Sequence, residues 1–376
     1  MSRGKNPSEN TIRMLCGKAA GMCEFEGCGK RLFYDNVTLS EFNNAFVAHI
    51  IASSKKGPRG DAELSHKLSD KIENLMLMCA DHHKLIDIPS TGPRDYPVER
   101  LKEMKRNHEE RVERICSLFN VPKTEIVMFS SPIKGRVSVN IDYKLAAKAV
   151  LPNKQPDSPY GINIPVFSRQ DYRSEEYWKD CLSALEVQFN ANLYNPFIQF
   201  NKSNFSIFPI APIPLIIKLG ELIGDKLPCD VYQKTRMPDT WEWQSDEQTN
   251  NFDLHIDKLD FSNNSVALVL SLTDDISTAR VLQTGKYDAI YKIKAETLGV
   301  DCIKSTIDLS LFWHKFQETC DAILNSYGSG CIINLFPAIP VSAAFEVGRR
   351  YMPNTYPVIT IFDEDNGFFE TIKLGG

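Results

Sequence analysis

The sequence predicts an α+β protein of more than one domain, and three observations lead to this prediction. The chain has 376 residues, which is enough for two or three separate hydrophobic cores. The first hundred residues place cysteine and histidine pairs beside short apolar runs, a pattern typical of a small metal-stabilised domain. The second half contains a strand–helix–strand pattern twice, which indicates a parallel sheet covered by helices.

The repeated pattern occupies two segments of similar order. In residues 205–220 an apolar run leads into a helix that begins at Pro212, and in residues 331–348 a second run leads into a helix that begins at Pro340. Each helix is predicted to end at a glycine eight residues after its proline, with a further strand about ten residues later. Two related α/β units predict a crevice at the carboxyl ends of their strands, where such sheets bind ligands.

Composition excludes several classes of protein. The apolar content of 43% and the charged content of 24% are those of an ordinary soluble globular protein. No apolar run approaches the ~20 residues that span a bilayer, and the polar N-terminus lacks the apolar segment of a signal peptide. We therefore expect a cytoplasmic protein that does not contact membranes. Ten cysteines spread over this length do not form a disulfide framework.

The charge is distributed unevenly along the chain. The whole chain carries a net charge of −5, but residues 1–120 contain 19 Lys and Arg against 17 Asp and Glu. A small basic cluster at Lys55, Lys56 and Arg59 could contact phosphates, or it could be a solvated loop. Such weak positive charge predicts poor DNA binding by one copy and favours assembly into an oligomer.

Four residues of the N-terminal region have the spacing of zinc ligands. Cys23 and Cys28 form one pair, and Cys79 and His82 form a second, so that together they can close a tetrahedral structural zinc (Zn2+) site. Cys16 is a rival ligand, but it lies in an apolar helical run and is assigned to the core.

Three further residues, His49, Asn74 and His83, remain once the zinc ligands are assigned. The order His, Asn, His of these residues resembles that of the HNH endonucleases, which have a ββα-metal fold. The resemblance covers residues 10–90. The resemblance implies that His49 is the general base for an attacking water, and that Asn74 orients the loop of that base or touches a metal-bound water. His83 and Asp87, four apart on a helix, would hold a catalytic Mg2+ or similar ion, although Asp87 could equally be a helix-end carboxylate.

The ligand set of that catalytic ion stays open. Many HNH sites have Asp or His immediately before the catalytic histidine, whereas this chain has Ala48. Asp61 is a weaker alternative ligand.

The C-terminal half has a second resemblance. The runs 211–220 and 224–233, followed by Trp241 and Trp243, resemble the SAVED domain, a fusion of two CARF-like (Rossmann-like) units, over residues 160–376. Together, the two regions resemble the HNH–SAVED effector nucleases of CBASS anti-phage systems. The resemblance implies a bacterial DNase that a cyclic di- or trinucleotide switches on.

Aromatic and hydrogen-bonding side chains near the predicted strand ends are candidates for binding that ligand. Indoles can stack on bases, although clustered aromatics are often core. The candidate ligand-binding residues are Lys218, Tyr232, Gln233, Arg236, Trp241, Trp243 and Asn334.

The chain is predicted to comprise a nuclease domain in residues 1–120, a connector in residues 121–159 and a sensor domain in residues 160–376. An amphipathic helix over residues 97–119 closes the first domain. The connector mixes short β-like runs, including residues 136–140, with a helix near residues 143–150.

These predictions combine into a ligand-activated, metal-dependent double-strand DNA endonuclease. The expected partners are duplex DNA, a cyclic oligonucleotide and further copies of the chain, as a dimer or a tetramer when activated. One alternative is a non-enzymatic nucleotide sensor with a zinc-stabilised DNA- or protein-binding domain. Another is an effector that cleaves RNA.

Overall fold

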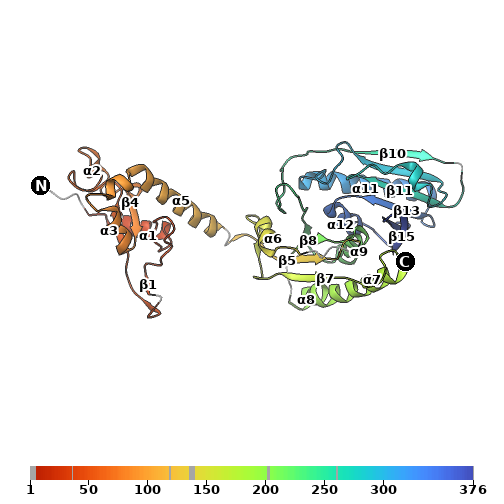
Figure 1. Cartoon of the computed structure of the whole chain (residues 1–376), viewed down its shortest axis with the longest axis horizontal. Helices are drawn as coiled ribbons and strands as arrows, with labels where there is room; N and C mark the ends of the chain where they lie inside the picture. The colour runs from red at the N-terminus through yellow and green to blue at the C-terminus, as the bar shows by residue number, and fades with distance from the viewer. Residues whose placement is uncertain are drawn as a thin grey trace. The chain divides into compact units, whose positions relative to one another are not determined.

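The computed structural model divides the chain into two compact units, Met1–Asn120 and Val121–Gly376 (Figure 1). It describes residues 6–35, 37–117, 120–134, 140–200, 204–259 and 261–375. The β-like run predicted at residues 136–140 therefore lies largely outside the described residues. In the described part of the chain, no helix is both long and apolar enough to cross a membrane.

The N-terminal unit is built around a small ββα arrangement. Strands β3 (Phe46–His49) and β4 (Leu75–Met78) pair antiparallel, and helix α3 (Ala80–Ile86) follows β4 after a single residue. The remaining elements of the unit are α1 (Glu9–Lys18), β1 (Tyr34–Asp35), β2 (Ser40–Glu41), α2 (Leu64–Lys67), η1 (Ile72–Asn74), α4 (Gly92–Asp95) and α5 (Val98–Ser117).

Burial of β4 explains why this unit folds around the strand pair. All four residues of β4 are buried, and they pack with Leu15 of α1, Ile86 of α3 and Leu101 of α5. Because β4 is buried on both faces, it is apolar throughout rather than alternating. This core holds β3 and α3, the two elements that carry the candidate catalytic histidines.

Helix α5, Val98–Ser117, matches the helix predicted over residues 97–119. Residues 118 and 119 of that prediction lie outside the described residues. Its buried residues are Leu101, Met104, Lys105 and His108. The last turn is exposed, with Ile115 57% exposed. The predicted apolar stripe therefore packs inside the unit at one end only.

The C-terminal unit contains two sheets in the described residues. The first has the order β6-β5-β8-β9, with β7 also paired to β5, and every pairing is parallel. Its strands are β5 (Lys123–Ser130), β6 (Gln155–Pro156), β7 (Ile162–Pro165), β8 (Phe205–Ile210) and β9 (Cys229–Val231). Its helices are α6 (Tyr143–Val150), α7 (Glu175–Phe189), the π-helix η3 (Asn190–Tyr194), α8 (Asn195–Phe200) and α9 (Ile213–Ile223).

The prediction that residues 121–159 form a connector is wrong. Strand β5 lies inside the first sheet, where Phe129 pairs with Ile164 on one side and Pro209 on the other. Six of its eight residues are buried, from Thr124 to Phe129. An apolar run placed between two other strands is an interior strand, so this segment belongs to the core of the second unit.

The second sheet has the order β10-β12-β11-β13-β14-β15, with parallel inner strands and antiparallel β10 and β15 at its edges. Its strands are β10 (Phe252–Lys258), β11 (Ser265–Ser271), β12 (Ala289–Ala295), β13 (Ile332–Ala338), β14 (Val358–Glu364) and β15 (Phe368–Leu374). Its helices are α10 (Thr278–Val281), α11 (Thr306–Tyr327) and α12 (Val341–Arg349).

The repeated strand–helix–strand pattern is present as β8–α9–β9 and β13–α12–β14, and both strand pairs are parallel. Helices α9 and α12 pack together between the two sheets (Figure 1). The prediction that these helices end at Gly220 and Gly348 is wrong, because both helices continue past the glycine. A Cβ atom added at Gly348 would lie 1.8 Å from the carbonyl oxygen of Ile217, so the glycines allow the helix backbones to touch.

Candidate metal centre, nuclease site and ligand pocket

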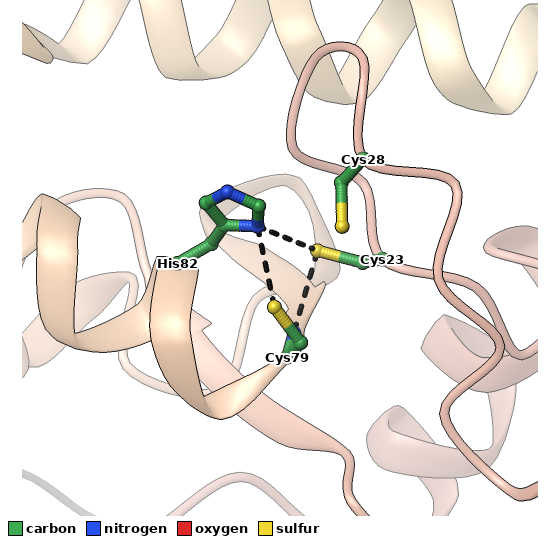
Figure 2. Close-up of side chains that lie close together, drawn as sticks. All are labelled: Cys23, Cys28, Cys79 and His82. Atoms are coloured by element: carbon green, nitrogen blue, oxygen red, sulfur yellow. Dashed lines mark hydrogen bonds between the residues drawn. The ribbon is translucent and has the colours of Figure 1, made fainter. Parts of the chain in front are cut away.

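Cys23, Cys28, Cys79 and His82 converge at one point of the N-terminal unit (Figure 2). Their ligand atoms all lie within 4.8 Å of one another. His82 Nδ1 is 3.2 Å from Cys79 Sγ and 3.7 Å from Cys23 Sγ. With metal–ligand bonds near 2.3 Å, tetrahedral zinc separates its ligand atoms by about 3.5–3.8 Å, so the spacing fits that ion.

The chemistry of the cluster also fits a cation. Burial, with the neighbouring thiols of Cys28 and Cys79, raises the pKa of Cys23 to about 12. A divalent cation bound here would favour the thiolate form of Cys23 over the thiol. Phe25 stacks on the ring of His82 with 4.0 Å between centroids, which fixes the orientation of the imidazole.

His49 stands at the end of β3, where its partner across the strand pair is Leu75. Its Nε2 lies 3.0 Å from the carbonyl oxygen of Ser69, which can only accept a hydrogen bond. Nε2 therefore carries the proton in this contact, and Nδ1 is left as the basic nitrogen. This is the protonation that a general base requires.

Asn74 is buried and holds the backbone that follows His49. Its Oδ1 accepts a hydrogen bond from Ile51 N at 2.8 Å, and its Nδ2 donates to Ile51 O at 2.9 Å. Nδ2 also donates to Leu68 O at 3.3 Å. Of the two roles expected for Asn74, this geometry supports orientation of the loop.

His83 lies in α3, and its ring is 5.6 Å from that of Phe46 at the start of β3. No hydrogen bond or ring contact joins His83 directly to His49 in the described residues. Asp87 is paired inside the protein, because its Oδ1 accepts a hydrogen bond from Arg59 Nη2 at 2.9 Å, although its side chain is 34% exposed. Asp61, the weaker alternative, accepts hydrogen bonds from the backbone at the start of α2.

Several residues predicted to bind a ligand are occupied by structural contacts. Trp241 is 1% exposed and packs edge-on against Phe208, so it is a core residue. Asn334 lies within the second sheet and donates to Ser265 Oγ at 2.9 Å. These two predictions are wrong, because both side chains are buried and packed against their own protein, where they cannot meet a ligand.

Gln233 and Lys218 are likewise engaged in contacts within the protein. Gln233 Oε1 accepts hydrogen bonds from the backbone and hydroxyl of Ser342 at the start of α12, at 3.1 and 2.7 Å. Lys218 forms an ion pair with Glu221 at 2.5 Å within α9. Arg236 is exposed on a turn.

Tyr232 and Trp243, by contrast, line a cavity of about 360 Å³ in the C-terminal unit. Trp313 and three cations, Lys154, Arg349 and Arg350, line it as well. The guanidinium of Arg350 lies 4.4 Å from the centre of the Trp313 ring. A pocket of this size with indoles and cations can stack bases and bind phosphates.

Two carboxylates hold the cations of this pocket in place. Glu346 accepts from Arg349 at 3.2 Å and from Arg350 at 2.9 Å, and Asp230 pairs with Lys154. Three cations against two carboxylates leave the pocket favourable for an anion. Sequence reasoning missed Lys154, Trp313 and the arginines, although the Arg-Arg pair after the second repeated helix was a visible signal.

Comparison with known proteins finds a family model that matches part of the chain. Residues 194–374 match the family model described as "SMODS-associated and fused to various effectors sensor domain", abbreviated SAVED. The matched residues all lie in the C-terminal unit. No curated protein sequence matches the chain.

Solved structures similar to the chain are Cap4 SAVED/CARF-domain containing receptors. The Acinetobacter baumannii receptor with the cyclic trinucleotide 2'3'3'-cAAA has a TM-score of 0.45 and 11% identity, over 73% of this chain and 60% of that receptor. The same receptor with 3'3'3'-cAAA has a TM-score of 0.42 and 11% identity, over 84% and 71%. The Moraxella osloensis receptor has a TM-score of 0.40 and 11% identity, over 74% and 60%.

Proposed function

We propose that this chain is a ligand-activated, metal-dependent endonuclease that cuts double-stranded DNA in bacterial anti-phage defence. The activator is a cyclic di- or trinucleotide bound by the C-terminal unit. The observation that carries the proposal is the joining, in one chain, of a SAVED sensor domain to a ββα unit with a Cys/His cluster beside His49 and His83.

In the proposed reaction, His49 accepts a proton at Nδ1 from a water that attacks the scissile phosphorus. The new P–O bond forms as the bond to the 3′ oxygen breaks, and that oxygen leaves with the electron pair and takes up a proton. A Mg2+ or similar ion, which His83 would help to hold, would stabilise the charge on the phosphate. Zinc bound by the four-residue cluster would stabilise the fold and take no part in the chemistry.

The proposed activator site is the cavity lined by Trp243, Trp313, Lys154, Arg349 and Arg350. A base stacked on an indole contributes ~1–3 kcal/mol, and the cations bind the phosphates. Raising the active fraction from about 1% to 99% needs a preference of ~5.5 kcal/mol for the active state. Two stacked bases and two paired phosphates supply an energy of this order.

Supercoiled plasmid incubated with Mg2+ and a panel of cyclic di- and trinucleotides tests the proposal. We expect linear product with one class of activator and little cutting without it. His49→Ala should retain zinc while losing ~10²–10⁴-fold in cleavage rate, the usual contribution of a positioned base. Apo protein that cuts as fast as the activated protein would disprove the gating.

The same experiment separates the alternatives. Retention of the plasmid on the protein without cutting, under all activators, would favour a non-enzymatic sensor with a DNA-binding domain. Cutting of RNA in preference to the plasmid would favour an RNA-cleaving effector. Light scattering with and without the activator tests the proposed dimer or tetramer, since opposite strands are cut most readily by two sites.

A further inference from the structure

Arg59 is a buried arginine that reaches three acceptors in the N-terminal unit. Its Nε donates to Ile50 O at 2.7 Å, its Nη1 to Ile86 O at 2.6 Å and its Nη2 to Asp87 Oδ1 at 2.9 Å. The side chain is 3% exposed. The expectation that Arg59 could contact phosphates is therefore wrong, because the guanidinium is enclosed and its donors are used inside the protein.

The three acceptors belong to the two elements that carry the candidate catalytic histidines. Ile50 directly follows His49 at the end of β3, whereas Ile86 and Asp87 close α3, the helix of His83. No backbone hydrogen bond links β3 to α3 in the part of the unit that the structure describes. The guanidinium of Arg59 supplies the hydrogen-bonded link between them.

The backbone at Arg59 supports a specific role for this side chain. Its φ is +55°, a left-handed conformation that residues other than glycine adopt rarely. The surrounding turn holds this conformation with hydrogen bonds from Gly57 N to Ser54 O and from Gly60 N to Gly57 O. Such strained positions persist where the neighbouring structure enforces them, and they concentrate at functional sites.

We propose that Arg59 is a positioning residue for the nuclease site, and that Asp87 is its counter-ion rather than a ligand of the catalytic metal. This inference rests on the proposed endonuclease function. A planar guanidinium presents donors in a fixed fork and can join two backbone carbonyls and a carboxylate at once, which a lysine ammonium cannot do from the same place. Arg59 thereby sets the distance between His49 and His83.

The test compares the activated full-length protein with three variants, Arg59→Lys, Asp87→Asn and the control Arg94→Lys. Arg94 is exposed and pairs only with its neighbour Asp95, so its variant applies the same chemical change at an unimportant position. The measurements are kcat and KM for plasmid cleavage, zinc content and the melting temperature.

Arg59→Lys should keep its zinc and its KM for DNA but lose ~10²-fold in kcat, the effect of displacing reacting groups by about 1 Å. Asp87→Asn keeps an oxygen for Arg59 Nη2 and should stay within about threefold of wild-type kcat, since only the charge of that contact is removed. Arg94→Lys should match the wild type. A higher KM with an unchanged kcat for Arg59→Lys would indicate that Arg59 binds phosphate and would overturn the inference.

Two other outcomes would overturn the inference while leaving the proposed function intact. In one, Arg59→Lys cuts as fast as the wild type. In the other, Asp87→Asn loses activity ~10²-fold at unchanged stability, which would make Asp87 a metal ligand. Asp87→Asn decides this second point even if Arg59→Lys does not fold. A wild-type protein that cuts no DNA under any activator disproves the function itself, so the two failures are distinguishable.

Discussion

The side-chain amide of Asn74 pairs with both backbone polar groups of Ile51, at 2.8 Å to the nitrogen and 2.9 Å to the oxygen. Ile51 lies two residues beyond His49, and both Ile51 and Asn74 are buried. The amide thus takes the place of a partner strand at the point where β3 ends. This amide, Arg59 and a backbone hydrogen bond from Ile50 N to Asn74 O at 2.8 Å together set the direction in which the chain leaves His49.

Asn74→Ala should destabilise the N-terminal unit and weaken cleavage together. The substitution leaves the N–H and C=O of Ile51 buried without their partner, which costs ~2–4 kcal/mol for two such groups. Urea unfolding gives the free energy, and plasmid cleavage gives the rate. Asn10→Ala, at an exposed position of α1, is the control, and equal stability of the two variants would contradict the proposed role of Asn74.

Cys79→Ser should release zinc and unfold the N-terminal unit, because the free energy of metal binding is folding free energy in a domain of this kind. The C-terminal unit has its own core and should still melt cooperatively. Metal analysis of the purified wild type should give about one zinc per chain. Cys116→Ser is the matched control, since that cysteine is exposed and outside the cluster. Full zinc content in Cys79→Ser would rule out the site.

Trp243→Ala and Trp241→Ala should behave differently, although the two residues are neighbours in sequence. Trp243 lines the cavity, so its loss should raise the activator concentration needed by about 5–100-fold, with the maximal cutting rate unchanged. Trp241 is fully buried, so its loss should cost ~3–5 kcal/mol of stability. Activator titration and thermal melting distinguish the effects. An unchanged titration for Trp243→Ala would remove the cavity from the proposal.

Asp308→Asn should lower the stability of the C-terminal unit relative to the wild type, and this loss should be larger at neutral pH than at acid pH. Burial alone would raise the pKa of Asp308, but hydrogen bonds from Thr249, Lys304 and Ser305 outweigh it and lower the pKa below its usual value. A lowered pKa contributes stability above the unfolded pKa, near 4, and that contribution is lost as the pH falls through the folded value.

Asp308→Asn should lower the free energy of unfolding by ~2 kcal/mol at pH 7, and its difference from the wild type should be smaller at pH 3. Urea unfolding at the two pH values measures this. Asp257→Asn on the exposed strand β10 is the control. A difference that is the same at both pH values would show that the charge of Asp308 is not what stabilises the unit.

The sequence predicted those parts of the protein in which local spacing determines geometry. Cys79 and His82 lie one helical turn apart, and Cys23 and Cys28 lie on one short loop, so short-range structure brings together the members of each pair. The repeated strand–helix–strand units were recognisable for the same reason, because their apolar runs and prolines mark the elements.

The errors arose where burial depends on segments that are distant in sequence. Trp241 is in the core because Phe208, thirty-three residues away, covers it, and no local pattern separates it from Trp243. Arg59 resembles a surface cation in sequence, yet its acceptors belong to β3 and to the end of α3. Strand β5 was mistaken for a connector because its neighbours β7 and β8 come after it in the chain.

The contact between α9 and α12 restricts how the two sheets of the C-terminal unit can move. At Gly220 and Gly348 the helix backbones already touch, with a Cβ added at Gly220 only 2.2 Å from the carbonyl oxygen of Phe345. The helices cannot approach further at these glycines, and separating them would expose the buried apolar side chains of both. Rotation about the glycines is the motion that keeps this surface covered. We therefore expect the helix pair to act as a pivot, so that a molecule bound beside it would change the angle between the two sheets and not the distance between them.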